Sequence, residues 1–427
     1  MPRSVWALRR IAADPIEFLT TLAQQGDVVP FAIGRRSAFL LNHPAHIEEV
    51  LVTHQDKFAK GPAFLRAGRL LGTGLLTAEG ALHRGRRRIA SPAFHRMQMD
   101  RHVDTIVARA SAERDSWTHG ETIDVAERMA ALTFGIVGET LFGADLAHHT
   151  SRVRRAVAAA TASGDSLVSL LAPVRRVDRE RKQLDTVVDE LIARRLATPN
   201  AGAGDLLSML IEADADAPSS PQLRDDVLTI LLAGHDTIAS AMTWTWALLA
   251  SHPEADEQLA RELASVLDGR SATAADLPRL PFTRSVLAES LRIYPPAWVL
   301  ARLSLQPHRI GTTVMPEDSL VIMSQYLVHR DPRFFEDPLA FRPERWLTDA
   351  GSTRPRLAYF PFGAGPRSCI GEPFAWTEGV LLLATLAQRW TLKMKEAPAE
   401  PAPQITLRPR GPVRMIPERR QVCLREP

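Results

Sequence analysis

One short segment combines the residue types that are best suited to chemistry. Cys369 lies among three glycines, Gly363, Gly365 and Gly371, and precedes an apolar stretch with helical character, Phe374–Leu386. A helix N-terminus just after a cysteine supplies positive potential and free N–H groups, which favour the thiolate. Glycines permit tight turns and a close approach to a flat cofactor, where a Cβ would clash. The segment therefore predicts a thiolate that binds a metal held in a planar group.

Two plainer explanations of Cys369 fit less well. An isolated buried cysteine in a glycine-rich turn is common, but it does not account for Phe362 and Arg367 at fixed offsets from it. A zinc site needs a second cysteine or histidine at ligand spacing, and the sequence has none nearby. The other cysteine, Cys423, lies in a polar C-terminal tail, and we expect it to be inert.

The spacing of these residues resembles the haem-loop signature F-x-x-G-x-R-x-C-x-G of the cytochrome P-450 superfamily. Phe362, Gly365, Arg367, Cys369 and Gly371 match every fixed position of that signature. The resemblance implies that these five residues hold haem b and that Cys369 binds its iron. Arg367 would contact a haem propionate, and Phe362 would shield the proximal side from water.

A second motif lies in the long apolar stretch at the centre of the chain. The run Ala233-Gly234-His235-Asp236-Thr237 resembles the A/G-G-x-D/E-T motif of the same superfamily. The resemblance implies that Ala233 borders the haem, that Thr237 hydrogen-bonds to the oxygen being activated, and that Asp236 relays protons to it. Gly234 weakens a helix by roughly 1 kcal/mol relative to alanine, which predicts a local kink. We expect His235 to be non-catalytic.

Plainer explanations exist for the acid and the alcohol of this motif. Asp236 could be a helix acid paired with a nearby base, and Thr237 could return its hydroxyl bond to the helix backbone. Taken alone, either explanation would be preferred. Next to the cysteine loop, the proton-relay interpretation is favoured.

Two further motifs resemble the scaffold of the superfamily. Glu289 and Arg292 match E-x-x-R, and Arg345, followed by Trp346, matches the P-E-R-F region with tryptophan in place of phenylalanine. A Glu/Arg pair at this spacing is usually a solvated helix face that contributes little. The resemblance instead implies a buried triad of Glu289, Arg292 and Arg345 that fixes the cysteine loop.

A basic run supplies further candidates for binding the cofactor. His83 and Arg87 lie four residues apart on a predicted helix and could reach the haem propionates together, and Arg302 matches a third propionate ligand of the superfamily. Arg84 and Arg88 share the neighbouring face and would point outward. That face is either a solvated helix surface or a docking site for an acidic redox partner.

Composition limits the classes of protein to which the chain can belong. The 427 residues carry a formal net charge of +3 without a dense basic block, so we expect no nucleic-acid partner. The N-terminus lacks the apolar run of a signal peptide or anchor. Val227–Ala250 is long enough to span a bilayer, but His235 and Asp236 within it favour a buried helix. We therefore expect a cytoplasmic monomer without a membrane anchor.

The pattern of apolar residues predicts a mainly α-helical fold, and the resemblance implies the cytochrome P-450 fold, with a large helical part and a smaller β-rich N-terminal region. We expect one domain, 1–427. Short strand patterns predict two hairpins, 28–41 and 308–324. Helical periodicity is clearest in four segments: Val103–Trp117, Ile123–Leu141, Leu184–Leu196 and Leu259–Leu267.

The resemblance implies a haem-thiolate monooxygenase, an oxidoreductase that inserts one atom of O2 into a hydrophobic small molecule. No flavin or nicotinamide segment follows the haem loop, so we expect electrons from a separate ferredoxin and its reductase. Apolar segments at 62–76, 161–174 and 298–300 would line the substrate site. Two alternatives are a peroxide-driven haem-thiolate enzyme and a non-catalytic haem sensor, neither of which needs Asp236 and Thr237.

Overall fold

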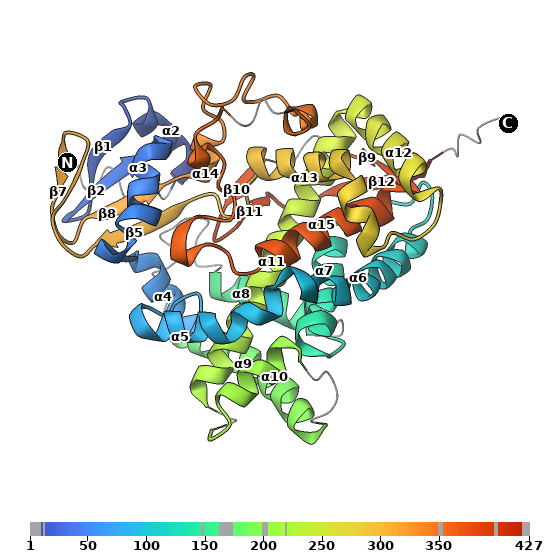
Figure 1. Ribbon diagram of the computed structural model, residues 1–427, viewed down its shortest axis with the longest axis horizontal. Helices are drawn as coiled ribbons and strands as arrows, with labels where there is room; N and C mark the ends of the chain where they lie inside the picture. The colour runs from blue at the N-terminus through green and yellow to red at the C-terminus, as the bar shows by residue number, and fades with distance from the viewer. Residues whose placement is uncertain are drawn as a thin grey trace.

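The computed structural model describes residues 10–11, 13–146, 149–161, 174–198, 204–217, 220–348, 353–396 and 400–420. Its α-helices form most of the molecule (Figure 1). They are α2 Pro15–Ala23, α3 Pro44–Glu48, α4 Pro62–Leu71, α5 Gly80–Ala90, α6 Arg96–Ser116, α7 Val125–Phe142, α8 Thr150–Thr161, α9 Val174–Ala197, α10 Leu206–Ala213, α11 Pro221–Ser251, α12 Pro253–Leu267, α13 Pro281–Ile293, α14 Gln325–Val328 and α15 Glu372–Ala387.

The strands and the short helical turns are concentrated at the two ends of the chain. The strands are β1 Val28–Ile33, β2 Arg36–Leu41, β3 Phe58–Lys60, β4 Ile123–Asp124, β5 Leu300–Ser304, β6 His308–Ile310, β7 Thr313–Met315, β8 Leu320–Met323, β9 Trp390–Met394, β10 Pro401–Pro403, β11 Leu407–Pro409 and β12 Arg414–Arg419. The short turns are η1 Glu49–Thr53, η2 Gln55–Lys57, η3 Ser91–Phe94, η6 Ala274–Arg279, η7 Pro343–Trp346, η9 Arg356–Ala358 and η10 Gly365–Arg367.

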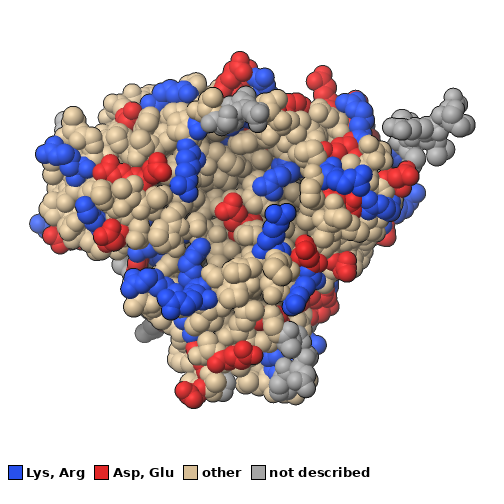
Figure 2. Space-filling model, in the orientation of Figure 1, with Lys and Arg blue, Asp and Glu red and all other residues tan. Residues whose placement is uncertain are grey.

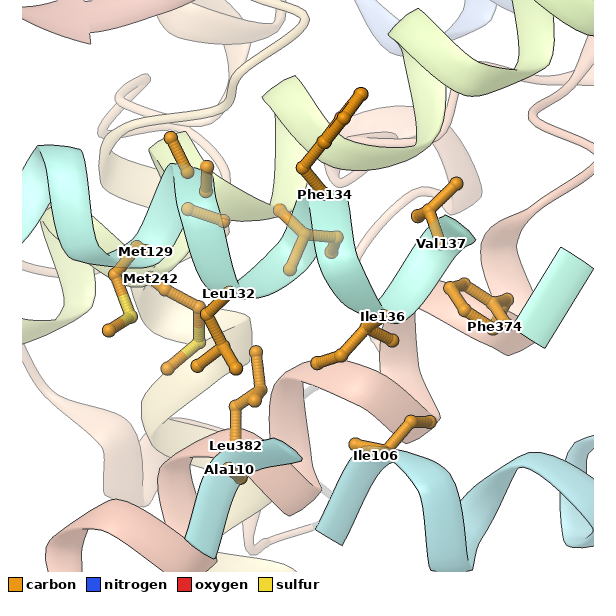
Figure 3. Packing of buried hydrophobic residues seen from close by; sticks show 14 of the residues in the cluster. Ile106, Ala110, Met129, Leu132, Phe134, Ile136, Val137, Met242, Phe374 and Leu382 are labelled. Carbon is orange, nitrogen blue, oxygen red and sulfur yellow. The ribbon is translucent and has the colours of Figure 1, made fainter. Parts of the chain in front are cut away.

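The largest apolar core lies between α6, α7, α11 and α15. Ile106 of α6, Leu132 of α7, Met242 of α11 and Leu382 of α15 are all buried in one cluster, which Figure 3 shows from close by. Burial of a side chain of this size contributes about 1.5–3 kcal/mol. The core therefore fixes α11 and α15, the two helices that carry the predicted motifs.

The β-rich region is built on a five-stranded sheet with the order β1-β2-β8-β5-β3. β1 and β2 pair antiparallel from Val28↔Leu41 to Ile33↔Arg36, which confirms the first predicted hairpin. β8 pairs with β2 in parallel and with β5 antiparallel. The region thus joins N-terminal strands with strands from residues 300–323, and it lies to one side of the helices (Figure 1).

The second predicted hairpin, 308–324, is wrong. β6 pairs with β7, from His308↔Met315 to Ile310↔Thr313, and Gly311 makes the turn between them at a φ of 55°. The following strand, β8, leaves this pair and becomes a central strand of the larger sheet. Val321 of β8 is fully buried there. Packing between distant segments decides the partner of β8, and spacing along the chain does not reveal it.

Helix α11 is buried along almost its whole length, which explains its apolar sequence. Its first turn is capped by Ser220, whose hydroxyl accepts a bond from the N–H of Leu223 at 3.0 Å. Arg86 of α5 donates to Asp226 of α11 at 2.5 Å, so α5 is tied directly to this helix. Within the described residues, no helix is both long enough and apolar enough to cross a membrane.

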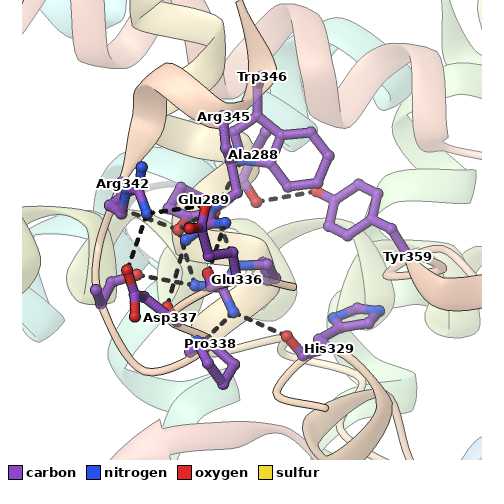
Figure 4. A network of polar contacts seen from close by, with 12 residues as sticks. Ala288, Glu289, His329, Glu336, Asp337, Pro338, Arg342, Arg345, Trp346 and Tyr359 are labelled. Carbon is purple, nitrogen blue, oxygen red and sulfur yellow. Dashed lines mark hydrogen bonds and ion pairs between the residues drawn. The ribbon is translucent and has the colours of Figure 1, made fainter. Parts of the chain in front are cut away.

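The segment before the cysteine loop is held by the predicted triad. The Arg292 guanidinium donates to both Glu289 carboxylate oxygens at 2.8 Å, and Arg345 donates to one of them at 2.9 Å. Trp346 adds an indole N–H bond to Glu289 at 2.8 Å, a contact that phenylalanine could not make. Glu289 and Arg292 are fully buried, and Figure 4 shows the segment around residues 336–346 folded onto them.

The Glu289 network also explains why a charge is tolerated in this interior. Burial alone raises the pKa of the Glu289 carboxyl, but hydrogen bonds and charges from Arg292 and Arg345 outweigh it and lower the pKa below its ordinary value. The remaining Arg292 donors bond to the backbone oxygens of His329, Pro338 and Ala340. The Glu289 and Arg292 charges are therefore paired, and Arg292 also holds the backbone of residues 329–340 at three points.

We predict that Glu289→Gln removes this support, because it leaves Arg292 buried without a counter-charge. Breaking a buried pair in this way costs about 3–5 kcal/mol. Denaturant unfolding of the purified protein should show the loss as a lower unfolding midpoint.

The matched control is Glu344→Gln, which changes an exposed acid of the same motif. It should leave stability within about 0.5 kcal/mol of wild type. Equal unfolding midpoints for the two variants would contradict the supporting role of Glu289.

Candidate functional site

The cysteine loop is a fixed turn between η10 and α15. The N–H of Cys369 donates to the carbonyl of Phe362 at 2.8 Å, which closes the loop on itself. Arg87 of α5 donates to the carbonyl of Ser368 at 2.7 Å, so a second element holds the loop from outside. Gly371 is the N-cap of α15, which places the start of that helix directly after the cysteine, as predicted.

Two glycines of the loop serve different purposes. Gly365 has a φ of 71°, and a Cβ there would lie 2.0 Å from the carbonyl oxygen of Leu51 in η1. The close approach at Gly365 is therefore to the protein backbone, which by itself requires a glycine at this position. A Cβ on Gly371 would lie 3.9 Å from the Cys369 sulfur, an ordinary contact distance, so the protein alone does not require a glycine there.

Cys369 combines exposure with strong desolvation. Its side chain is exposed, yet the surrounding protein raises the pKa of the thiol to about 11 through burial, and the backbone bond at Gly371 opposes this only in part. The sulfur is thus accessible although protein groups surround it closely. The backbone N–H of Gly371 at the helix start lowers the pKa of Cys369, and a bound metal ion would favour the thiolate further.

The middle of α11 also contains an accessible residue. Ala233 is exposed and Gly234, Asp236 and Thr237 are half-buried, whereas most of α11 is buried, as expected for a stretch that faces open space. The hydroxyl of Thr237 donates to the Ala233 carbonyl at 2.9 Å, which is the plainer arrangement considered for it. The helix runs unbroken from Pro221 to Ser251, so Gly234 does not interrupt it.

Asp236 is bound to the C-terminal hairpin formed by β10 and β11. Thr406 donates to one carboxylate oxygen at 2.8 Å, and the guanidinium of Arg408 pairs with the other. Burial raises the pKa of Asp236, but the charge of Arg408 and both hydrogen bonds lower it below its ordinary value. The acid is therefore ionised and oriented. The base that the plainer explanation required is Arg408, which sequence reasoning did not identify.

The same hairpin is attached to α11 along one face. Ser240 and Trp244 lie four and eight residues after Asp236, and both donate to the carbonyl of Leu407, at 2.7 and 3.0 Å. Steps of four residues keep these side chains on one side of the helix. The hairpin therefore sets the position of Asp236 through several bonds.

A group of buried basic residues lies near the cysteine loop. Lys60, His83 and Arg302 are each 6–7% exposed. Burial lowers the pKa of Lys60 to about 8, with Glu79 opposing the shift, and burial with the charges of Arg367 lowers the pKa of Arg302 to about 10. The pKa of His83 falls to about 4 through burial and the charges of Lys60 and Arg367, so its imidazole is neutral at pH 7.

The basic groups Lys60, Arg302 and Arg367 interact here with one another and with the acid Glu79, so positive charge exceeds negative charge among them. Arg302 donates only to the carbonyl of the adjacent Ala301 in the bonds found within the described residues. Arg367, predicted to contact a propionate, instead pairs with Glu79 and donates to the carbonyl of Phe58 at 3.2 Å. Lys60 and Glu79 were not identified from the sequence, because their partners are far away along the chain.

The residues present fit a haem. Cys369 offers a sulfur ligand, Ala233 leaves open space on α11, and the buried cations suit two carboxylate groups that would supply the missing negative charge. Arg302 and His83 are placed to hold those carboxylates, while Arg87 contributes through the loop backbone.

Several other expectations are settled by burial. Arg84 and Arg88 are exposed, as predicted. Trp298 is 1% exposed and donates to the carbonyl of Gln404 at 2.9 Å, so it belongs to the core and its expected contact with substrate is corrected. Of the segment 161–174, residues 162–173 lie outside the described residues, as does Cys423.

Comparison with protein families gives a match over nearly the whole chain. The family model for cytochrome P-450 matches residues 5–424. Among solved structures, the haem domain of cytochrome P-450DA superposes with a TM-score of 0.86 and 25% sequence identity, covering 97% of this chain and 95% of its own.

Three of the curated relatives come from Streptomyces. Cyclooctatin synthase of Streptomyces melanosporofaciens is 38% identical over 96% of this chain and 92% of its own. Cyclooctat-9-en-7-ol 5-monooxygenase of the same organism is 36% identical over 89% of this chain and 85% of its own. Pentalenene oxygenase of Streptomyces avermitilis is 33% identical, with coverage of 89% and 87%.

We predict that Arg302→Gln weakens haem retention, because it removes a buried guanidinium that suits a propionate. Loss of one charge-assisted bond corresponds to haem transfer that is about tenfold to a hundredfold faster. Transfer to an excess of a haem-scavenging protein measures this rate. The control, Arg309→Gln, alters an exposed arginine close by and should not change it; equal rates in both variants would argue against the assignment of Arg302.

Proposed function

The chain belongs to the cytochrome P-450 family and is a haem-dependent monooxygenase that acts with O2 on hydrophobic molecules, and on that premise we propose that its substrate is a cyclic terpenoid and its cofactor haem b. The observation that carries the proposal is the complete cysteine-loop signature beside a surplus of buried cations. The relatives narrow the substrate class, since their names refer to pentalenene and to cyclooctat-9-en-7-ol.

The chemistry of the exposed apolar side chains supports a hydrocarbon-rich substrate. Leu76, at the end of the segment after α4, is 39% exposed, and Ile405, between β10 and β11, is 63% exposed. Ile405 directly precedes Thr406, which bonds to Asp236 of α11. We place these two residues, with the half-buried Val299 and Leu300, at the substrate. Contact with such side chains favours apolar molecules but does not select among them.

Binding of the cofactor divides between three elements. Cys369 would bind the iron, with Phe362, Gly365 and Gly371 shaping the loop, and Arg302 and His83 would hold the propionates. When bound, the haem supplies the oxidation chemistry that transfers one atom of O2 to the substrate. The protein supplies the ligand, the orientation and a low-dielectric surrounding.

Proton delivery falls to the two adjacent polar residues of α11. Asp236 stays ionised beside Arg408, so it can accept a proton from solvent and release it inward. Thr237, whose hydroxyl now donates to the Ala233 carbonyl, can turn that hydroxyl toward the exposed side of Ala233 and pass the proton on. These are the catalytic roles that we propose for the pair.

Electrons reach the enzyme from separate redox proteins, which we propose to be a ferredoxin and its reductase. Arg84 and Arg88 are exposed, and Figure 2 shows basic side chains gathered over α5. Arg87 of the same helix bonds to the cysteine loop, so a partner on α5 would sit close to Cys369. A basic surface steers acidic partners. We further propose that the enzyme acts in the cytoplasm as a monomer with one domain, 1–427.

The proposed function predicts two spectral results and one product. The CO-bound ferrous protein should show the red-shifted band of a thiolate ligand, and cyclic terpene alkenes or alkenols should give a type I shift that fatty acids of equal carbon number do not. With a ferredoxin, its reductase and NAD(P)H, such a ligand should yield a monooxygenated product.

Turnover with peroxide alone would favour a peroxide-driven enzyme, and ligand shifts without turnover would favour a haem sensor. A normal thiolate band together with shifts only for fatty acids would remove the terpenoid proposal and leave the monooxygenase intact.

We predict that Arg408→Gln disturbs proton delivery without harming substrate binding. Without Arg408, burial dominates and the pKa of Asp236 rises, so the acid becomes protonated at a higher pH than in wild type. Product formed per NAD(P)H should then fall several-fold and should decrease further as the pH is lowered. Wild type should stay flat, because its Asp236 has a pKa below the ordinary value and remains ionised.

The matched control is Arg410→Gln, an exposed arginine just beyond the same hairpin. It should retain wild-type coupling and pH dependence. The dissociation constant for substrate should equal the wild-type value in both variants. If Arg408→Gln behaves like Arg410→Gln, Arg408 does not position Asp236 for the reaction.

A further inference from the structure

Three potential metal ligands meet at the edge of the β-rich region, away from α11. Glu49 and His54 come from η1 and its C-cap, and His308 is the first residue of β6. The η1 turn is a π-helix, in which the N–H of His54 donates to the carbonyl of Glu49 at 2.8 Å. A π-turn brings residues five apart together, and such turns are frequent at functional sites.

The side chains of the three residues converge. One carboxylate oxygen of Glu49 lies 3.0 Å from Nε2 of His308, and the potential ligand atoms of all three residues lie within 4.8 Å of one another. The imidazole rings of His54 and His308 are 5.0 Å apart at 70°. The Glu49 side chain is 28% exposed and that of His308 is 7% exposed, so the group opens to solvent on the carboxylate side.

We propose that Glu49, His54 and His308 bind a divalent transition-metal ion, with Zn²⁺ the best match. Two imidazoles and one carboxylate form an established ligand set for zinc, with a fourth position left for water. Zinc–ligand bonds of about 2.0–2.2 Å place ligand atoms about 3.3 Å apart, so side-chain shifts of about 1 Å would complete the site. A hydrogen bond between Glu49 and His308 alone would not require a third residue. The imidazole of His54 nevertheless lies within 4.8 Å of both, as a metal site would need.

The location gives this ion a structural consequence for the haem loop. The η1 turn carries Leu51, whose carbonyl oxygen is packed against Gly365 so closely that a Cβ there would lie 2.0 Å from it. On the other side of the group, the ring of Phe58 packs edge-on to His308 at 5.3 Å, and the Phe58 carbonyl accepts a bond from Arg367. An ion bound by η1 and β6 would therefore hold two supports of the cysteine loop together.

Equilibrium dialysis of the tag-free, haem-loaded enzyme against buffered Zn²⁺, followed by elemental analysis, tests the site. Bound haem keeps Cys369 from competing for the metal. The informative variants are Glu49→Gln and His54→Gln, which change partly exposed side chains and keep their size. The matched control is His46→Gln, because His46 makes a ring contact with His43 nearby but lies outside the group.

We expect one zinc ion per chain in wild type and in His46→Gln, and binding weakened more than about tenfold in the other two variants. Zinc should also slow the heat-induced loss of the thiolate-type CO band in wild type and in the control only. The CO band before heating confirms that each variant is folded.

Absence of bound zinc in wild type, or equal affinity in all four proteins, would overturn the proposal. Weakening in His46→Gln as well would place the zinc elsewhere and would also overturn it. None of these results bears on whether the enzyme is a monooxygenase, because the site lies outside the proposed reaction machinery.

Discussion

The constraint that shapes this molecule is the need to balance charge where water is excluded. Two buried groups of charged residues differ in how their charge is balanced. Around Glu289, the protein supplies every partner, since two guanidiniums, an indole and backbone groups surround one carboxylate. Around Arg302, the protein leaves positive charge in excess, and the lowered pKa values of Lys60 and Arg302 record that excess. The first group is balanced by the protein itself, whereas we propose that an anionic cofactor completes the second.

The two groups are connected through the cysteine loop. The Glu289 network fixes the segment that precedes the loop, and Arg367 within the loop reaches the cation group through Glu79. A cofactor bound by Arg302 and Cys369 would therefore add a further link between β5 and the cysteine loop, which the protein already connects through β3 and Arg367. Folding and cofactor binding are coupled here because buried charge without a partner costs free energy.

Local spacing predicted those features whose partners lie close in sequence or in a recognisable motif. The signature around Cys369, the hairpin of β1 and β2, and the triad of Glu289 could all be found in this way. Features that depend on distant packing could not be. β8 takes β2 and β5 as partners, Arg367 takes Glu79, and Asp236 takes Arg408, 172 residues away. No periodicity or spacing encodes such pairs, since a single sequence shows which residues are polar and not which of them meet.

The pairing of Asp236 changes how the motif on α11 is best understood. In sequence, an acid next to an alcohol on a helix fits either a proton relay or a structural pairing with a nearby base. In the structure, the acid is also the point at which the C-terminal hairpin is attached to the helix, together with Ser240 and Trp244. The hairpin carries Ile405, a candidate for contact with substrate, directly beside Thr406. A substrate that displaces Ile405 would therefore act on the bonds that orient Asp236, and this arrangement would link substrate binding to proton delivery.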